Sequence, residues 1–445
     1  MRERRWNVVG DMPIGKLLFR LSPPVMLALL IQSVYNIIDS YFVAQYSLTG
    51  LTALSLVFPI QQLATALATG AGTGLGILIA RMDGSGDTAA QRDAIKSGLW
   101  LGVFDFALFA CVTLAALQGY FALSSDQPLV RQQGVQYARV VLAGSLGLFV
   151  ESHCTKILQA RGNTFVPMLA QVTGAALNIV LDPILIFGWL GAPAMGVTGA
   201  ALATVIGQWA AMAITLGAVC RSCDLTGRVR LHLCAGIYRS GLAPIAMQSL
   251  YTLYIVGLNL ILKQFTEDAV TVLGIYYKLQ TFFFIPLMGL QQVIVPVLSF
   301  NHSAGAEGRV RETLRWAVGI SEAVMAMATA VFLLAPQALL RIFSASPSIL
   351  ETGVPALRII CLSFLPAGVA MMLTVFFQGT GQSGQSLFVT VLRQVVLLVP
   401  LAWAFHFAGL TYVWLTFPVT EVLSVLCALV FYRRTPFLSK RRNAE

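Results

Sequence analysis

Several acidic side chains lie inside long apolar segments of this chain, where a charge is costly. A charged group near the centre of a membrane span costs about 2.5–3.5 kcal/mol on insertion scales, so it marks an ion or substrate pathway by default. The acidic residues in this position are Asp39, Asp105, Glu151, Asp182, Glu322 and Glu421. Carboxylates can bind a cation or exchange a proton, and both reactions are candidates here.

Two of these carboxylates share one depth. Asp39 and Asp182 each lie about six residues from the outer end of an apolar segment, ~9 Å deep at 1.5 Å per residue, and Thr204 lies ~12 Å deep. Asn178 is one helical turn before Asp182, so both occupy one helix face. Pro183 cannot donate a backbone hydrogen bond and frees a carbonyl oxygen four residues back. We expect a cation or proton site; the alternative is that Asp182 only caps a broken helix.

The apolar segments that must position these residues recur along the whole chain. Hydrophobic residues make up 57% of the 445 residues and charged residues 11%, whereas a soluble domain carries roughly a quarter charged residues. A segment of about twenty apolar residues can cross a membrane as a helix. The pattern predicts an all-α integral membrane protein with twelve transmembrane helices, near residues 17–45, 51–80, 97–121, 131–156, 163–188, 195–220, 237–263, 270–300, 314–338, 348–377, 385–407 and 410–432.

The two halves of the chain resemble each other. A shift of 219 residues lays Pro128 on Pro347, Gly134 on Gly353 and Gln159 on Gln378. Repeats of this kind are typical of transporters in which one bundle of helices rocks against the other. We expect two pseudo-symmetric six-helix lobes: an N-lobe at residues 1–221, a cytoplasmic loop at 222–236 that serves as the hinge connector, and a C-lobe at 237–445.

The repeat also indicates which half couples an ion to transport. Near the start of the chain the shift is 220 residues, so the position equivalent to Asp39 is Asn259; the shift of 219 makes Leu401 the equivalent of Asp182. The second half therefore lacks both carboxylates, and we place cation or proton coupling in the first half.

The basic residues predict how the chain lies in the membrane. Most of the 29 Lys and Arg residues fall in the terminal segments and in loops on one side, which is the positive-inside pattern. It explains the net charge of +10 without a nucleic-acid partner. We expect a multi-pass monomer in a bacterial plasma (inner) membrane, in contact with lipid, with both termini cytoplasmic.

No catalytic arrangement stands out, so we expect no enzyme activity and no cofactor. The glycine-rich run Gly70–Gly76 superficially resembles a dinucleotide loop, but no strand precedes it, and close helix packing is the better interpretation. A zinc site in the central loop is conceivable, although its ligand spacing is unusual; cysteines at the membrane edge without metal are the alternative. The residues concerned are Cys220, Cys223, His232 and Cys234.

Four motifs resemble those of a known family. They are SVYNIIDSYFV around Asp39, QARGNTFVPM from Gln159, NIVLDPILIFG from Asn178 and MGVTGAALATV from Met195. Together they are similar to the multidrug and toxic compound extrusion (MATE) family, in particular its bacterial MepA-like branch. The resemblance implies a twelve-helix fold of two lobes that exports cationic or amphipathic compounds, including antibiotics, in antiport with H⁺ or Na⁺. It also implies an N-lobe coupling site at Asp39, Asn178, Asp182 and Thr204, where Na⁺ would bind at the first three.

A substrate cavity between the lobes is expected to be apolar and aromatic with few polar anchors. The candidates are Tyr35, Glu151, Gln248, Tyr251, Tyr254, Tyr276, Phe283 and Met288; the alternative for each is a packing or lipid-facing role. The rival function is a flippase for a lipid-linked saccharide, which would need a basic cavity for pyrophosphate. Few basic residues lie inside the predicted spans.

The basic residues lead to a prediction about topology. Both termini and the loop Arg221–Tyr238 are expected to lie in the cytoplasm, because positively charged segments stay on that side. Cysteine labelling in intact cells with a reagent that cannot cross the membrane measures this. Labelling of the loop from outside would contradict the orientation.

Overall fold

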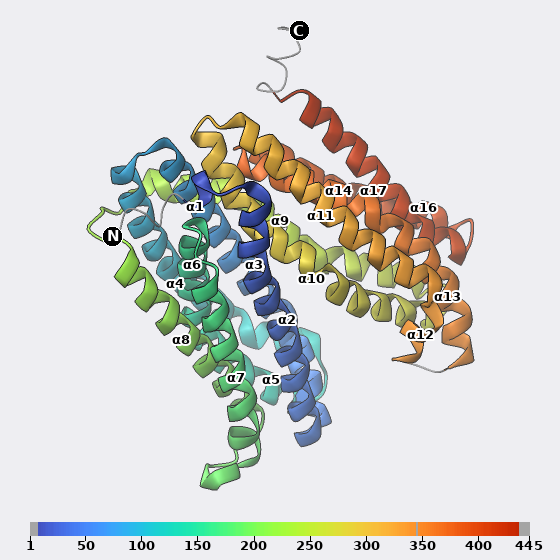
Figure 1. Ribbon diagram of the computed structural model, residues 1–445. Helices are drawn as coiled ribbons and strands as arrows, with labels where there is room; N and C mark the ends of the chain where they lie inside the picture. The colour runs from blue at the N-terminus through green and yellow to red at the C-terminus, as the bar shows by residue number, and fades with distance from the viewer. Residues whose placement is uncertain (1–7, 344–345, 436–445) are drawn as a thin grey trace. The chain divides into compact units, whose positions relative to one another are not determined.

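The computed structural model describes residues 8–343 and 346–435, and these residues form helices without a β-strand (Figure 1). Among the described residues, eleven helices are long and apolar enough to cross a membrane. A bent pair, Pro128–Gly144 with Leu146–Ala160, makes a twelfth if it is one span broken by 42°. The predicted all-α membrane fold with twelve spans is confirmed.

From residue 8 onward, the described part of the first half contains eight α-helices and one short 3₁₀-helix. They are α1 (Val8–Asp11), α2 (Ile14–Tyr46), α3 (Leu48–Ser85), α4 (Thr88–Ser124), α5 (Pro128–Gly144), α6 (Leu146–Ala160), α7 (Phe165–Phe187), η2 (Trp189–Gly191) and α8 (Val197–Ser222).

The second half follows the same plan with more interruptions. Its elements are α9 (Leu231–Leu262), α10 (Glu267–Ser303), α11 (Glu307–Leu334), α12 (Pro336–Arg341), α13 (Pro347–Ile360), η3 (Cys361–Ser363), α14 (Phe364–Gly379), α15 (Ser383–Val391), η4 (Leu392–Leu397), α16 (Leu398–His406) and α17 (Leu410–Arg433). The segment η4 is π-helical and joins α15 to α16 within one span.

Large apolar side chains cover the outside of the helices. On α4, Trp100, Phe104 and Leu108 recur every four residues and are 59%, 58% and 54% exposed. A surface helix of a soluble protein carries polar residues on such a face. The exposed apolar stripe is therefore the surface expected to contact lipid.

The chain divides into two compact units that do not coincide with its two halves. Unit 1 contains the described residues before Met12 together with Phe19–Ile245, and unit 2 contains Met12–Leu18 and the described residues from Ala246 onward. The first turns of α2 thus belong to unit 2, where the guanidinium of Arg309 donates a hydrogen bond of 2.9 Å to the carbonyl oxygen of Met12. In the same way, α9 begins in unit 1.

The central loop also belongs to unit 1, because it is bound to α4. Arg230 forms an ion pair with Asp93, whose carboxylate also accepts a hydrogen bond of 2.8 Å from the backbone N–H of Arg228. Arg92 pairs with Asp224 at 3.1 Å. Hydrogen bonds from the side chain and backbone of Thr226 hold the pKa of Asp224 below its ordinary value. The boundary between the units differs from the loop at 222–236, since these contacts attach the loop to one unit.

The glycine run of α3 packs helices closely, as the sequence indicated. A Cβ atom on Gly70 would lie 2.2 Å from a side-chain carbon of Ile245, and one on Gly74 would lie 2.1 Å from the carbonyl oxygen of Ile237. On α9, a Cβ atom on Gly241 would lie 2.6 Å from the carbonyl oxygen of Gly70. These glycines let α3 and the first half of α9 approach each other.

This packing predicts opposite effects for two glycine substitutions. Gly74→Ala is expected to cost about 1–3 kcal/mol of stability, because the added methyl group overlaps backbone atoms of α9. Gly119→Ala on α4 is the control, since nothing lies within 4 Å of the added carbon; it should stabilise the helix by about 0.5–1 kcal/mol. Thermal unfolding of both variants in detergent measures the difference. Equal midpoints for the two variants would contradict the close approach.

Candidate functional site

Three of the four predicted coupling residues meet between α7 and α8. The side-chain N–H group of Asn178 lies 3.5 Å from a carboxylate oxygen of Asp182 and 3.4 Å from the hydroxyl oxygen of Thr204. Their exposed fractions are 2%, 0% and 9% in that order. Asn178 and Asp182 share a helix face because they are four residues apart, and Thr204 comes from the next helix.

The helix α7 continues past Pro183 to Phe187, so Asp182 does not cap a broken helix. It ends at Gly188, whose φ of 79° suits a residue without a side chain. The chain then turns through η2 and returns, and the N–H groups of Met195 and Gly196 donate hydrogen bonds to the carbonyl oxygens of Leu185 and Ile186. This turn starts α8 at the height that places Thr204 beside Asn178.

Two glycines set the distance between these helices. A Cβ atom on Gly174 of α7 would lie 2.7 Å from the carbonyl oxygen of Gly207, and one on Gly207 would lie 2.6 Å from the carbonyl oxygen of Gly174. Both distances are shorter than real Cβ contacts. Only glycine fits at these two positions, one turn before Asn178 and one turn after Thr204.

Asp39 reaches the same region from α2. Its carboxylate interacts electrostatically with Asp182 and with the hydroxyl groups of Tyr35 and Tyr137. In the described part of the chain, three buried acceptor oxygens here have no hydrogen-bond donor, one each on Asp39, Asn178 and Asp182. Buried acceptors normally have a partner, so these oxygens suit a proton, a small cation or ordered water.

Tyr137 also lies in this region, although the sequence analysis did not identify it as a candidate. It is 2% exposed, and its hydroxyl group accepts a hydrogen bond from Gln61 at 3.5 Å and contacts Thr204. A tyrosine in a predicted span is a weak signal, because most such residues serve only in packing.

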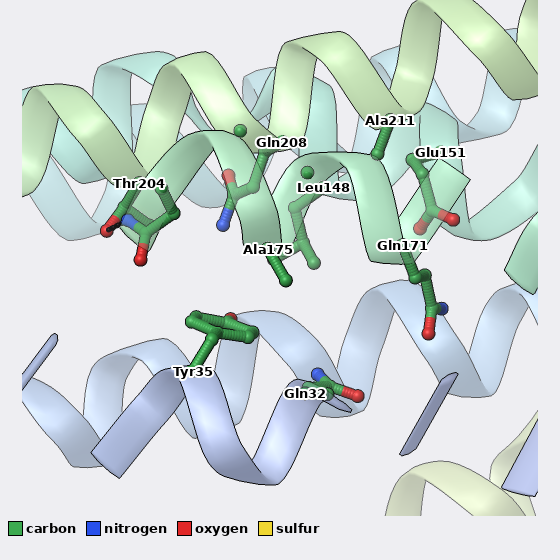
Figure 2. A pocket seen from close by; sticks show the side chains of 12 residues that line it. Gln32, Tyr35, Leu148, Glu151, Gln171, Ala175, Thr204, Gln208 and Ala211 are labelled. Carbon is green, nitrogen blue, oxygen red and sulfur yellow. Dashed lines mark hydrogen bonds between the residues drawn. The ribbon is translucent and has the colours of Figure 1, made fainter. Parts of the chain in front are cut away.

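A cavity of about 100 Å³ adjoins the site (Figure 2). It lies within unit 1 between α2, α6, α7 and α8, and Asn178 and Thr204 form part of its wall. Figure 2 shows Tyr35 and Gln32 on one side, facing Gln208, with Thr204 at one end. Its volume suits several water molecules.

Two of the predicted substrate residues, Tyr35 and Glu151, line this cavity. Sequence reasoning missed the three glutamines of its wall. They are Gln32, Gln171 and Gln208. The signal that could have identified them is an uncharged amide side chain within an apolar segment. Sequence reasoning concentrated on the carboxylates in these segments.

The other predicted substrate residues lie in unit 2. Tyr251 and Tyr254 have ring centroids 5.4 Å apart, and both lie near Tyr277, at 6.0 and 6.2 Å. Tyr276 is buried beside Tyr277. The structure thus gathers three of these predicted residues in one tyrosine cluster.

The remaining three predicted substrate residues are placed separately. Phe283 packs against Phe332 with centroids 5.4 Å apart, Met288 is 40% exposed, and Gln248 is half-buried. None of the three lines the cavity of unit 1.

The other acidic residues of the spans are held by neighbouring side chains or face close backbone. Glu421 forms an ion pair of 2.6 Å with Arg393, and Asp105 accepts a hydrogen bond from Tyr238. One oxygen of Glu322 is buried 2.6 Å from the place that a Cβ atom on Gly368 would take. Glu421 thus has a cationic partner, and Asp105 has a neutral hydrogen-bond donor.

The cysteines around the central loop are not grouped for a metal. Within residues 8–343 and 346–435, no three His, Cys, Asp or Glu side chains are arranged to hold an ion. Cys220 is exposed, and the thiol of Cys223 contacts the guanidinium of Arg161 at 2.7 Å.

Comparison with known proteins identifies relatives over nearly the whole chain. The MatE family model matches residues 24–184 and 244–404, which agrees with the internal repeat. The multidrug export protein MepA of Staphylococcus aureus is 24% identical over 439 residues, which is 97% of this chain and 96% of MepA. MepA of Staphylococcus haemolyticus is 22% identical, with the same coverage.

Solved transporter structures are also similar to this chain over nearly its whole length. An outward-facing multidrug resistance MATE transporter of the MOP superfamily superimposes with a TM-score of 0.89 at 26% identity, over 98% of this chain and 99% of that one. A MOP superfamily transporter from Pyrococcus furiosus gives 0.87 at 25% identity, over 96% and 97%.

Proposed function

Because the chain belongs to the MatE family of multidrug export transporters, we propose that it exports cationic or amphipathic compounds in exchange for H⁺ or Na⁺. The protein is a multi-pass membrane transporter and not an enzyme. Its place in a bacterial plasma membrane, with both termini in the cytoplasm, is part of the proposal and rests on the distribution of basic residues.

The observation that carries the proposal is the set of uncompensated carboxylates in unit 1. Asp39 and Asp182 interact with each other, and each has a buried oxygen without a donor in the described chain. No arginine or lysine forms an ion pair with either among the described ion pairs. A proton or a cation would relieve the repulsion between the two negative charges.

Ion binding at this site would favour one conformation of unit 1. With the carboxylates neutralised, α2 can pack against α7 and α8 without burying charge. With the carboxylates charged, the same packing is costly, so the cavity would open to water or drug. Coupling in an alternating-access cycle requires such a differential free energy between the two states.

The available driving force is sufficient for export. A tenfold proton gradient supplies about 1.4 kcal/mol for each proton, and a potential of 100 mV adds about 2.3 kcal/mol for each charge. Two protons entering for each monovalent cation exported would therefore support accumulation outside the cell.

The cavity of unit 1 argues against a flippase for a lipid-linked saccharide. Its wall carries the acidic residue Glu151 and no lysine or arginine, whereas a pyrophosphate group needs basic partners.

Two substitutions test the coupling site. Asp39→Asn and Asp182→Asn each keep the side-chain shape and remove the charge, so each should abolish gradient-driven drug transport in proteoliposomes while drug binding changes little. The assay imposes either a pH gradient or a sodium gradient, which also identifies the ion.

Glu322→Gln is the matched control, since it removes a carboxylate from a span of unit 2 where no coupling is proposed. It should leave ion coupling intact. Glu421→Gln is unsuitable, because it would leave the charge of Arg393 buried without its partner. Normal pumping by both Asn variants would show that the coupling site lies elsewhere.

A further inference from the structure

The cavity of unit 1 has a second carboxylate at the end opposite the coupling site. Glu151 and Gln171 lie together at this end, and Thr204 marks the other (Figure 2). Gln171 precedes Asn178 by two turns of α7, which is about 10 Å along the helix axis. Thr204 and Ala211 of α8 are separated by the same length. The cavity therefore extends from the coupling site toward the end of the unit where α6 carries Lys156.

Glu151 is held firmly by its neighbours. Its carboxylate accepts a hydrogen bond of 2.6 Å from the hydroxyl group of Thr155 and another from the amide of Gln171. The ammonium group of Lys156 interacts with it electrostatically. Lys156 is itself 6% exposed and donates a hydrogen bond of 3.1 Å to Gln159. A carboxylate, a hydroxyl group, an ammonium group and an amide thus follow one another along α6.

These contacts make Glu151 a poor anchor for a cationic drug. Lys156 offsets its charge, and Thr155 and Gln171 occupy its oxygens. The cavity beside it, about 100 Å³, suits water rather than a drug-sized molecule.

The wall between the two carboxylate regions offers acceptors for water. The side-chain oxygens of Gln171, Gln208 and Asn178 are buried and have no donor in the described chain. All three residues line the cavity. Water molecules that donate to such oxygens would form a chain from Glu151 to the Asn178–Asp182 pair.

We propose that Glu151 is a proton relay, through which the coupling proton passes between the Asp39–Asp182 pair and the side of the membrane where Lys156 lies. This inference rests on the proposed function and deepens it by assigning H⁺ as the ion. A hydrated proton in the cavity transfers to a carboxylate oxygen of Glu151, forming an O–H bond and leaving neutral water. Glu151 then gives this proton to a water molecule on the Lys156 side of the cavity. Lys156 stabilises the carboxylate of Glu151 that is left.

The other titratable groups around the cavity belong to four helices. Cys154 and Lys156 lie on α6 with Glu151, Tyr35 and Asp39 come from α2, Tyr137 comes from α5, and Asp182 comes from α7. The cavity residues of α8 are uncharged. A change in pH dependence caused by Glu151 must therefore be separated from the effects of Asp39 and Asp182.

The test uses the full-length protein in proteoliposomes with a pH-sensitive dye inside. Glu151→Gln keeps the hydrogen-bonding shape but cannot carry a proton, so drug-stimulated proton movement should fall about tenfold or more, as is usual when a positioned proton-transfer group is lost. Glu151→Asp should restore part of the rate. Drug affinity at equilibrium should change less than about twofold, since the drug does not contact Glu151 in this proposal.

Three outcomes would overturn the relay. They are an unchanged proton rate in Glu151→Gln, a loss of drug affinity that accounts for its slow transport, and drug transport by the unchanged protein that a sodium gradient drives without proton movement. Thermal unfolding and gel filtration of each variant exclude misfolding as the cause. Asp182→Asn, measured in parallel, tests the coupling site separately: loss of coupling there with a normal Glu151→Gln variant rejects the relay and keeps the proposed function.

Discussion

The approach of α7 and α8 at Gly174 and Gly207 determines the geometry of the site. A side chain at either position would collide with the carbonyl oxygen of the other, so the two helices can pack this closely only because both residues are glycine. The same approach lets Asn178 reach Thr204 across the helix interface and leaves room beside the helices for the cavity. A methyl group at this point would separate the helices and weaken both features together.

Helical periodicity was enough to pair Asn178 with Asp182, because residues four apart share a face. Periodicity could not place Thr204, which is 26 residues away from Asn178 and whose height depends on the turn after Gly188. The depth of Thr204 in its segment and the family resemblance were the basis for including it. The glutamines of the cavity and Tyr137 gave no clear signal, since an amide or a phenol in a span is compatible with many roles. The unit boundary inside α9 was likewise hidden, because it follows from the contacts of Gly70 and Gly74 rather than from local composition.

The two halves share a helix pattern but treat buried charge differently. In unit 2, Glu421 has Arg393 as a partner at 2.6 Å, beside the tyrosine cluster. Arg393 lies in the π-helical segment η4, a kind of interruption that often occurs at functional sites. In unit 1, Asp39 and Asp182 have no basic partner among the described ion pairs. An opposite charge nearby favours the charged form of a carboxylate, so the two units differ in whether a buried carboxylate has a charged partner.

The exchange of segments between the units has a consequence for biosynthesis. Met12–Leu18 belong to unit 2, and the hydrogen bond from Arg309 to Met12 spans 297 residues of sequence. The ribosome adds about 5–20 residues per second. It therefore reaches Arg309 tens of seconds after it has made Met12. The start of α2 must wait in the membrane without its final contacts during this time. Assembly of unit 2 therefore cannot finish before most of the chain has been translated. All residues of unit 1, in contrast, are present once Ile245 has been made.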